Sequence, residues 1–132
     1  MDMHAEATFT IGKWDEQPYY EATDGAKMTR AEVSYVYHGD IEGHGMVQYL
    51  MTYRPDGTGI AIAFERITGS IGGRSGSFVI QHDDTFKVDE VTGTYRVVPG
   101  TGTDELRGVQ GRGVLSVAGP GPYSFVLDYG FE

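Results

Sequence analysis

Glu65 is the first candidate for chemistry, because it is a carboxylate inside an otherwise apolar stretch, "IAIAFERI" (Ile60–Ile67). Alternate residues of a β-strand point to opposite faces. The face that carries Glu65 also carries small or apolar residues: Gly59, Ala61, Ala63 and Ile67. Small side chains lining a barrel leave space for a ligand, and a desolvated carboxyl group there can act as an acid or a base. We predict Glu65 as the catalytic residue, or alternatively as a structural carboxylate paired with an arginine or placed at a barrel mouth.

Arg66 follows directly and belongs to the opposite face of the same strand. If Glu65 points inward, Arg66 points outward and forms a surface ion pair. A shift of one residue in the assignment would exchange the two faces. Arg66 would then lie in the interior and suit a ligand that bears a carboxylate, and we retain it as a candidate ligand-binding residue.

Four tyrosines and one histidine are further candidates for ligand binding. Tyr49 and Tyr53 lie on one face of a predicted strand, where their rings could stack on a ligand and their hydroxyls could donate hydrogen bonds. Tyr95 and Tyr129 admit the same interpretation, and core packing is the alternative for all four. His82 shares a face with Phe78 and Ile80, and we expect it at a strand end, before Asp83-Asp84. It could act as a base, or be structural or exposed.

The stretch "YVYHGDIEGHG" raises the question of a metal site. His38, Asp40, Glu42 and His44 are spaced by two, so an unbroken strand would place all four on one face, as a divalent cation requires. Glycines on both sides of Asp40 and Glu42 instead favour a turn, which separates the four side chains. We therefore expect a solvated hairpin here and assign no metal ligands.

The glycine-rich run "ITGSIGGRSGSFVIQH" (Ile67–His82) could be a phosphate loop or a turn between strands. A phosphate loop needs a helix after its glycines, together with Gly-Lys-Ser/Thr. Here Gly72-Gly73 precede the β-type run "SFVI", so we predict a turn. The sequence also has no Gly-x-Ser-x-Gly motif between a strand and a helix, so nothing supports a serine hydrolase.

Two-residue alternation continues along the chain and predicts about eight short strands, with no helix of about ten residues or more. Residues 17–27 contain Pro18 and Asp24-Gly25, which predict a loop. Thr103 is placed to cap one helical turn over residues 104–106. We predict one all-β domain over residues 1–132, an antiparallel up-and-down barrel of eight strands. A sandwich is the alternative; a barrel is favoured because closure removes edge strands.

The composition of the chain limits the classes of partner that the protein can bind. The formal net charge is −9, which disfavours nucleic acid and anionic membranes. The chain has no cysteine, which excludes disulfides and thiolate chemistry. No apolar run is long enough to span a membrane, and "MDMHAEATFT" lacks the features of a signal peptide. We expect a soluble cytoplasmic protein, and a homodimer because strands such as "GIAIAF" are apolar on both faces.

Two segments carry a resemblance: "GGRSGSFV-x-QH" at residues 72–82 and "VVPGTGT-x-EL-x-G" at residues 97–108. With these segments, nearly the whole chain resembles a bacterial family of domains of unknown function, family 3224, whose members look like small allene oxide cyclase-like barrels of the lipocalin-like kind. The resemblance implies an isomerase or cyclase that folds a flexible hydrophobic substrate inside the barrel. None of those enzymes' catalytic residues matches a position here.

Three functions fit these observations. The barrel could bind a small hydrophobic molecule and isomerise or cyclise it, with Glu65 as the charged group and no cofactor. It could instead carry such a molecule without chemistry. It could also be a structural domain whose interior is filled by side chains.

Overall fold

The computed structural model describes residues 2–132 and forms a closed antiparallel β-barrel in which each strand pairs with the next along the chain. The last strand returns to the first, which confirms the predicted up-and-down barrel. The elements are β1 (Met3–Glu21), β2 (Lys27–Gly39), β3 (Ile41–Tyr53), β4 (Gly59–Ile71), β5 (Arg74–Phe86), β6 (Glu90–Val97), the short 3-10 helix η1 (Asp104–Leu106), β7 (Val109–Ala118) and β8 (Tyr123–Phe131). Among residues 2–132, no helix has the length and apolar character needed to cross a membrane.

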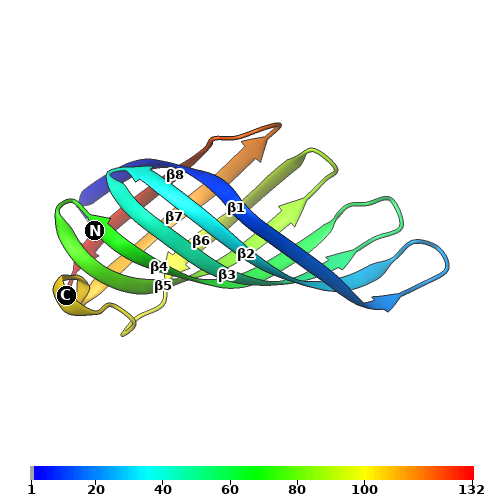
Figure 1. Ribbon diagram of the computed structural model, residues 1–132, viewed down its shortest axis with the longest axis horizontal. Helices are drawn as coiled ribbons and strands as arrows, with labels where there is room; N and C mark the ends of the chain where they lie inside the picture. The colour runs from blue at the N-terminus through cyan, green and yellow to red at the C-terminus, as the bar shows by residue number, and fades with distance from the viewer. Residues whose placement is uncertain (1) are drawn as a thin grey trace.

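The two ends of the barrel differ. At one end, which contains both termini and η1, β1 pairs with β8 over Met3–Phe9 and closes the barrel (Figure 1). Beyond Phe9, β1 continues beside β2 alone, and the four hairpin turns lie at staggered heights at the other end (Figure 1). We call these the closed end and the open end. Pairing of β1 with β8 thus closes the barrel at one end, and at the other end β1 pairs with β2 alone.

The long first strand corrects one expectation from the sequence. Residues 17–21 do not form a loop but belong to β1, which pairs with β2 through Glu21↔Lys27. Pro18 is tolerated because this part of β1 has β2 as its one strand partner and a register shift lies between Pro18 and Tyr20, and proline occurs in sheets at edges and bulges. A register shift between Ile11 and Lys13 also lies on this strand. After it, Trp14 pairs with Val33, whose side chain is fully buried.

An apolar core extends from the closed end to the middle of the barrel. The following apolar side chains of this core have at most 1% of their surface exposed: Val33, Ile41, Ile67, Ile71, Phe78, Ile80, Leu106 and Leu127. Leu106 comes from η1, which lies against β5 and covers this end. Thr103 precedes η1 as predicted, but its side chain does not cap the helix. Its Oγ1 instead accepts a hydrogen bond of 3.0 Å from the Ser77 N–H, which ties η1 to β5.

Two predicted turns are confirmed. Gly72 and Gly73 form the turn between β4 and β5 with φ values of 55° and 84°, a conformation that glycine adopts without strain. Asp40 forms the turn between β2 and β3, and its hairpin places the His38 ring Nδ1 3.3 Å from Glu42 Oε2. The glycine run therefore serves the barrel's connectivity, and the His/Asp/Glu stretch is a hairpin tip.

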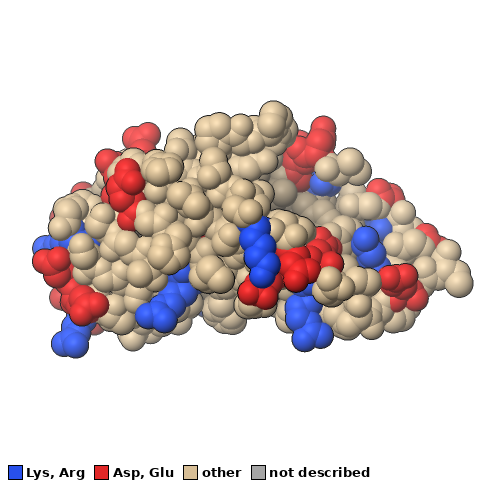
Figure 2. Space-filling view, viewed as in Figure 1, with Lys and Arg blue, Asp and Glu red and all other residues tan. Residues whose placement is uncertain are grey.

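Most charged side chains lie on the outside of the barrel, and Glu65 and Asp84 are buried exceptions. On the face seen in Figure 2, acidic and basic side chains are interspersed, with wide uncharged areas between them. The outward face of β4 contributes exposed apolar side chains: Ile60, Ile62 and Phe64, with 38%, 50% and 58% of their surface accessible. Both faces of β4 therefore carry apolar side chains, as the sequence suggests.

Candidate functional site

Glu65 lies inside the barrel with 0% of its surface exposed. It shares the inner face of β4 with Ala61 and Ala63, which are also buried. Arg66 is exposed on the outer face, and its Nη2 donates a hydrogen bond of 3.2 Å to Ser77 Oγ. The alternative register, with Arg66 in the interior, is therefore not the one observed, and Arg66 does not join the other candidates.

Glu65 is the centre of a buried polar cluster that joins three strands. Tyr37 of β2 donates its hydroxyl proton to Glu65 Oε2 at 2.6 Å, and His82 Nε2 of β5 lies 2.7 Å from Glu65 Oε1. Gly45 of β3 makes room for the carboxylate, since a methyl group at this position would overlap Oε2. Two-residue alternation brings all of these positions to the inner face, so the barrel itself assembles the cluster.

A second pair of hydroxyls lies beside this cluster. Tyr35 and Tyr49 share a hydrogen bond of 2.6 Å between their hydroxyl oxygens. Burial raises the pKa of Tyr37 and of Tyr49 well above the usual range of a phenol. Both hydroxyls therefore keep their protons at neutral pH. Tyr37 donates to Glu65, whereas either hydroxyl of the Tyr35–Tyr49 pair can be the donor. The His82 ring lies between two of the predicted ligand-binding tyrosines, with its centroid 6.2 Å from that of Tyr49 and 5.7 Å from that of Tyr95.

Two buried polar atoms of residues 2–132 lack a hydrogen-bond partner: His82 Nδ1 and Asp84 Oδ1. Both belong to the inner face of β5, two residues apart, and Asp84 has 2% of its surface exposed. Burial raises the pKa of Asp84 from 3.8 to about 6. Buried polar groups are almost always paired, so two neighbouring exceptions indicate a place where a small polar group would be bound.

Asp84 was missed from the sequence because we expected the strand to end at His82. In the structure β5 continues to Phe86, so His82 lies in mid-strand and Asp84 points inward. Gly93, its partner on β6, makes this possible, since a methyl group there would overlap the Asp84 carboxylate. A signal existed in the sequence: alternation from Phe78 through Ile80 and His82 reaches Asp84.

The arrangement can support proton transfer. In the tautomer whose Nε2 donates to Glu65 Oε1, the lone pair of the His82 ring lies on Nδ1. A carboxylate that fixes the tautomer and orientation of an imidazole is the arrangement by which histidine serves as a general base. The cluster thus contains an oriented base, two protonated phenols nearby and one carboxyl group with a raised pKa.

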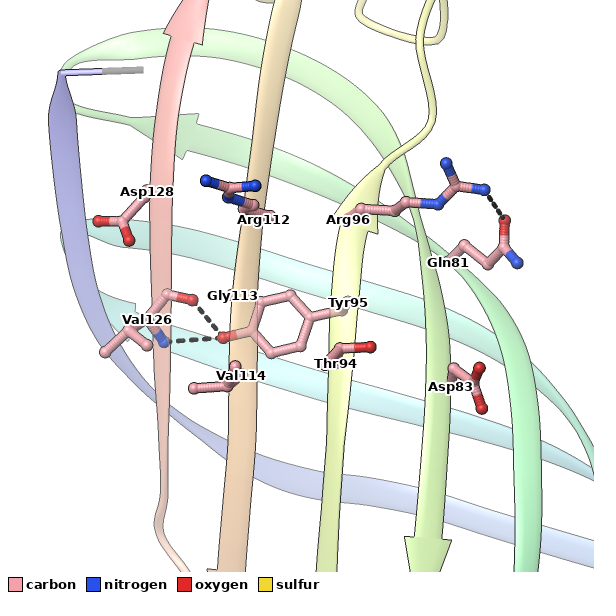
Figure 3. A pocket seen from close by; sticks show the side chains of 10 residues that line it. All are labelled: Gln81, Asp83, Thr94, Tyr95, Arg96, Arg112, Gly113, Val114, Val126 and Asp128. Atoms are coloured by element: carbon pink, nitrogen blue, oxygen red, sulfur yellow. Dashed lines mark hydrogen bonds between the residues drawn. The ribbon is translucent and has the colours of Figure 1, made fainter.

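Tyr95 supports the barrel at the seam between β7 and β8, which we define as the stretch where these two neighbouring strands are not paired along their full length. These strands pair only from Val109↔Phe131 to Arg112↔Asp128 and then separate. The Tyr95 ring passes Gly113, and its hydroxyl bonds both the carbonyl oxygen and the N–H of Val126 (Figure 3). A side chain at position 113 would overlap the ring. Tyr95 therefore replaces part of the missing ladder, which accounts for its burial without a ligand.

An outer groove of about 510 Å³ lies over this seam. Arg96 and Arg112 face each other across β6 and β7, but their guanidinium groups point apart, toward Gln81 and toward Asp128 respectively (Figure 3). Asp83 also lines the groove, so the two bases share it with two acids. The groove is separate from the Glu65 cluster, and Glu65 and His82 are not among its lining residues.

The remaining predicted tyrosines lie at opposite ends. Tyr129 is buried at the closed end, where its hydroxyl lies beside Gly72 in the β4–β5 turn and its ring is 6.1 Å from that of Phe131. Tyr53 is half-buried at the open end and donates a hydrogen bond of 2.5 Å to Glu16 Oε2. The structure thus brings Glu65, His82, Tyr49 and Tyr95 together and leaves Tyr53, Tyr129 and Arg66 apart from them.

Glu16 is a second carboxylate that the sequence did not reveal. It accepts hydrogen bonds from Thr29 at 2.7 Å, from Trp14 Nε1 at 3.0 Å and from Tyr53. Burial raises the pKa of Glu16, but the hydrogen bonds from Tyr53, Thr29 and Trp14 and the nearby charge of Lys27 outweigh burial, so its pKa is lowered overall. Because β1 was expected to end before this point, nothing in the sequence placed Glu16 near the interior.

Together, the fold and the cluster define a class of protein: a closed eight-stranded antiparallel barrel with a polar, tyrosine-rich interior. The chain belongs to the DUF3224 family, described as proteins of unknown function, whose model matches residues 5–129. A crystal structure of a DUF3224 protein of unknown function from Shewanella oneidensis MR-1 superposes with a TM-score of 0.82. It is 22% identical in sequence, and the match covers 98% of this chain and 97% of that one. No functionally curated protein matches the chain. The comparisons therefore establish family and fold.

Proposed function

We propose that this barrel binds a small, flexible hydrophobic molecule and isomerises or cyclises it by proton transfer, without a cofactor. The observation that supports this most is the Glu65–His82 pair, in which a buried carboxylate 2.7 Å from Nε2 leaves Nδ1 without a partner. His82 is the base and Glu65 the residue that orients it. Tyr49, through its high pKa, stays protonated as a donor toward oxygen on the substrate. This reverses the roles expected from the sequence, where Glu65 alone was the catalytic group.

The substrate reaches this centre from the open end. Trp14 has 45% of its surface exposed and stacks on Tyr49 at 5.9 Å, and Tyr49 in turn lies beside His82. These three rings lead from solvent to the unpartnered Nδ1. Because His82 has only 4% of its surface exposed, binding requires the rings at the open end to move apart.

The test is a thermal-shift screen with fatty-acid-like and polyketide-like compounds, followed by NMR of the histidine rings with each compound that stabilises the protein. A ligand that binds the native state raises Tm by mass action. We expect such compounds to shift the His82 ring signals and to lose affinity in His82→Gln. The matched control is His44→Gln, because His44 lies exposed on β3. A library without a single stabilising compound would overturn the proposal.

We also propose that the barrel is of the allene oxide cyclase-like, lipocalin-like kind. Eight antiparallel strands in sequential order, closed by pairing of the last with the first, support this assignment. Superposition on experimental structures of such enzymes tests it. A different strand tilt or a different number of interior layers would contradict it.

One observation favours a structural domain instead. Glu65 has no exposed surface, and the rings of Tyr37, Tyr95 and Phe125 fill the space around it, with centroids 5.1 Å and 4.6 Å from neighbour to neighbour. A barrel filled in this way is stable without a ligand. In the screen above, this alternative predicts unchanged Tm values and unchanged histidine signals for every compound, whereas a carrier binds compounds and leaves them chemically unaltered.

For the surroundings of the protein, we propose a cytoplasmic homodimer that binds neither nucleic acid nor membranes. Leu50 and Ile62 are cross-strand partners on the outer face of β3 and β4, each about half exposed, and Phe64 extends the apolar surface. Sedimentation velocity tests this, with Phe64→Ser expected to shift the population toward monomer. A monomer at all concentrations in the unaltered protein would exclude the dimer, and fractionation of cells tests the compartment.

A further inference from the structure

The open end of the barrel has a basic mouth. A hollow of about 440 Å³ there is lined by Lys27, Arg54 and Lys87 together with the rings of Tyr53 and Phe86. We use "the mouth" for this hollow. The chain has 19 acidic and 10 basic residues, yet three of the basic ones meet here and no Asp or Glu belongs to the lining. Four other hollows of the described residues differ: three contain an acid in their lining, and one is lined by a single base.

Three hairpins hold these bases in place. Lys27 begins β2 and pairs with Tyr53, the last residue of β3. Arg54 follows Tyr53 in the β3–β4 turn, where its N–H donates to the Thr58 carbonyl at 2.7 Å and its Nη1 to Thr58 Oγ1 at 3.2 Å. The Lys87 N–H donates to the Glu90 carbonyl at 2.8 Å in the β5–β6 turn. The backbones of the two turns are thus fixed by hydrogen bonds, which positions the charges before a ligand arrives.

Nearby acids compensate this charge only in part. Glu90 Oε1 lies 3.9 Å from Lys87 Nζ, at the limit of an ion pair. Asp56 accepts hydrogen bonds of 3.0 Å and 2.7 Å from Thr58, and these bonds together with the nearby charge of Arg54 lower its pKa. Glu16 accepts three hydrogen bonds and is close enough to Lys27 for that charge to help lower its pKa. Lys27 Nζ itself lies over the Tyr53 ring, 4.6 Å from its centroid. These acids lie outside the lining of the mouth, and the lining itself presents three cations to an anion.

The floor of the mouth is apolar. Phe86 packs edge-on against Tyr53, with ring centroids 4.9 Å apart, and both rings are half-buried against the core. Both rings belong to the lining of the mouth. A molecule with its charged group at the rim would thus place its apolar part on these two rings.

We propose that the mouth selects ligands with an anionic head group on an apolar body, such as a carboxylate or phosphate on a hydrocarbon chain. This rests on the proposed function, because it names the class of molecule that the barrel admits. The bases bind the head group, and the rings of Tyr53 and Phe86 contact the first carbons of the chain. The outer groove is a poorer site for such an anion, since Asp83 and Asp128 lie beside its two arginines.

Four probes with the same ten-carbon chain test the proposal: decanoate, decyl phosphate, decanol and decyltrimethylammonium, each below its micellar concentration. Trp14 is the only tryptophan and lies at the open end, so its fluorescence reports binding, with Tm as a second readout. We expect decanoate or decyl phosphate to bind at least tenfold more tightly than decanol at low salt, and the ammonium to bind weakest. The advantage of the anions should fall as salt is added.

The variant Arg54→Gln/Lys87→Gln removes two charges from the rim. It should weaken binding of the anions about tenfold and leave decanol unchanged. The matched control is Lys13→Gln/Arg107→Gln, which lowers the net charge equally but outside the mouth, and it should retain full anion affinity. Equal binding of decanoate and decanol, or equal effects of the two double variants, would overturn anion selection while the proposed binding function stands. If none of the four probes bound, the proposal for the mouth and the proposed function would both be overturned.

Discussion

The closed and open ends of this barrel differ in how β1 is paired and in which side chains occupy the interior. At the closed end β1 is paired on both sides, and isoleucine, leucine and phenylalanine side chains fill the interior. At the open end β1 has one partner, and its inward residues are Trp14 and Glu16, which remain in contact with solvent or with hydroxyl groups. The Glu65 cluster lies where these two environments meet.

The difference shows what barrel closure contributes. A strand edge must be paired or hydrated, so a core can be dry only where the ladder is complete on both sides. The seam between β7 and β8 makes the same point on a smaller scale, because the Tyr95 hydroxyl satisfies Val126 where the ladder stops. Stability should therefore concentrate at the closed end, and adaptability at the open end.

The largest effect is expected from Leu106→Ala at the closed end. Leu106 is fully buried, and truncation of a buried leucine leaves a cavity that costs about 3 kcal/mol. Leu115 is the matched position toward the open end, where it is only partly buried against the core. Leu115→Ala should cost about 1 kcal/mol, because less surface is lost from the interior.

Urea denaturation of both variants at neutral pH provides the comparison. A larger loss of unfolding free energy in Leu106→Ala would confirm that the closed end holds most of the stability. If Leu115→Ala were equally damaging, the contrast between the two ends would not extend to energetics.

Much of the architecture was accessible from the sequence because it depends on local periodicity. Alternation placed Glu65, Tyr49 and His82 on their faces, and the glycines at 72 and 73 marked a turn by their conformational freedom. These features need only the two-residue repeat of a strand and the restrictions on positive φ. The same alternation predicted about eight strands, and the family resemblance supported a barrel.

The polar cluster depends on contacts between strands, which one strand's pattern does not contain. In the sequence, nothing distinguishes Tyr37 from the other tyrosines that alternate along a strand. Its role follows from the barrel, which places its hydroxyl 2.6 Å from Glu65. Gly45 and Gly93 each make room for a carboxylate from a neighbouring strand, a role that depends on the pairing of the strands. Pro18 and Asp83-Asp84 led to the wrong prediction that their strands end early. Their local preference for turns is overridden by pairing with β2 and β6.

The next effect in size concerns the pH dependence set by Asp84. Its pKa is about 6 in the folded protein, against 3.8 as the ordinary value. Between these two pH values the folded chain holds a proton that the unfolded chain has released, so Asp84 makes stability fall as pH rises through this window. Well above pH 6 the penalty is complete, at about 3 kcal/mol. Asp84→Asn removes it.

Denaturation of the unaltered protein and of Asp84→Asn between pH 4 and pH 7.5 isolates this contribution, since other titrating groups cancel in the difference. We expect the variant to gain stability relative to the unaltered protein as pH rises. A difference that stays flat across the window would mean that Asp84 is hydrated, and the boundary between the two environments would then lie deeper in the barrel.

The smallest effect is expected at the open end, from Tyr53→Phe. This change removes the hydrogen bond of 2.5 Å to Glu16 while Thr29 and Trp14 still donate to the carboxylate. Water can replace the lost donor at this half-buried site, so unfolding at neutral pH should become easier by about 1 kcal/mol. Tyr20→Phe, at an exposed position of β1, provides the baseline and should change little. A loss in Tyr53→Phe as large as that in Leu106→Ala would show that the Glu16 contacts hold the end together as firmly as a packed core, and the open end would no longer be the adaptable one.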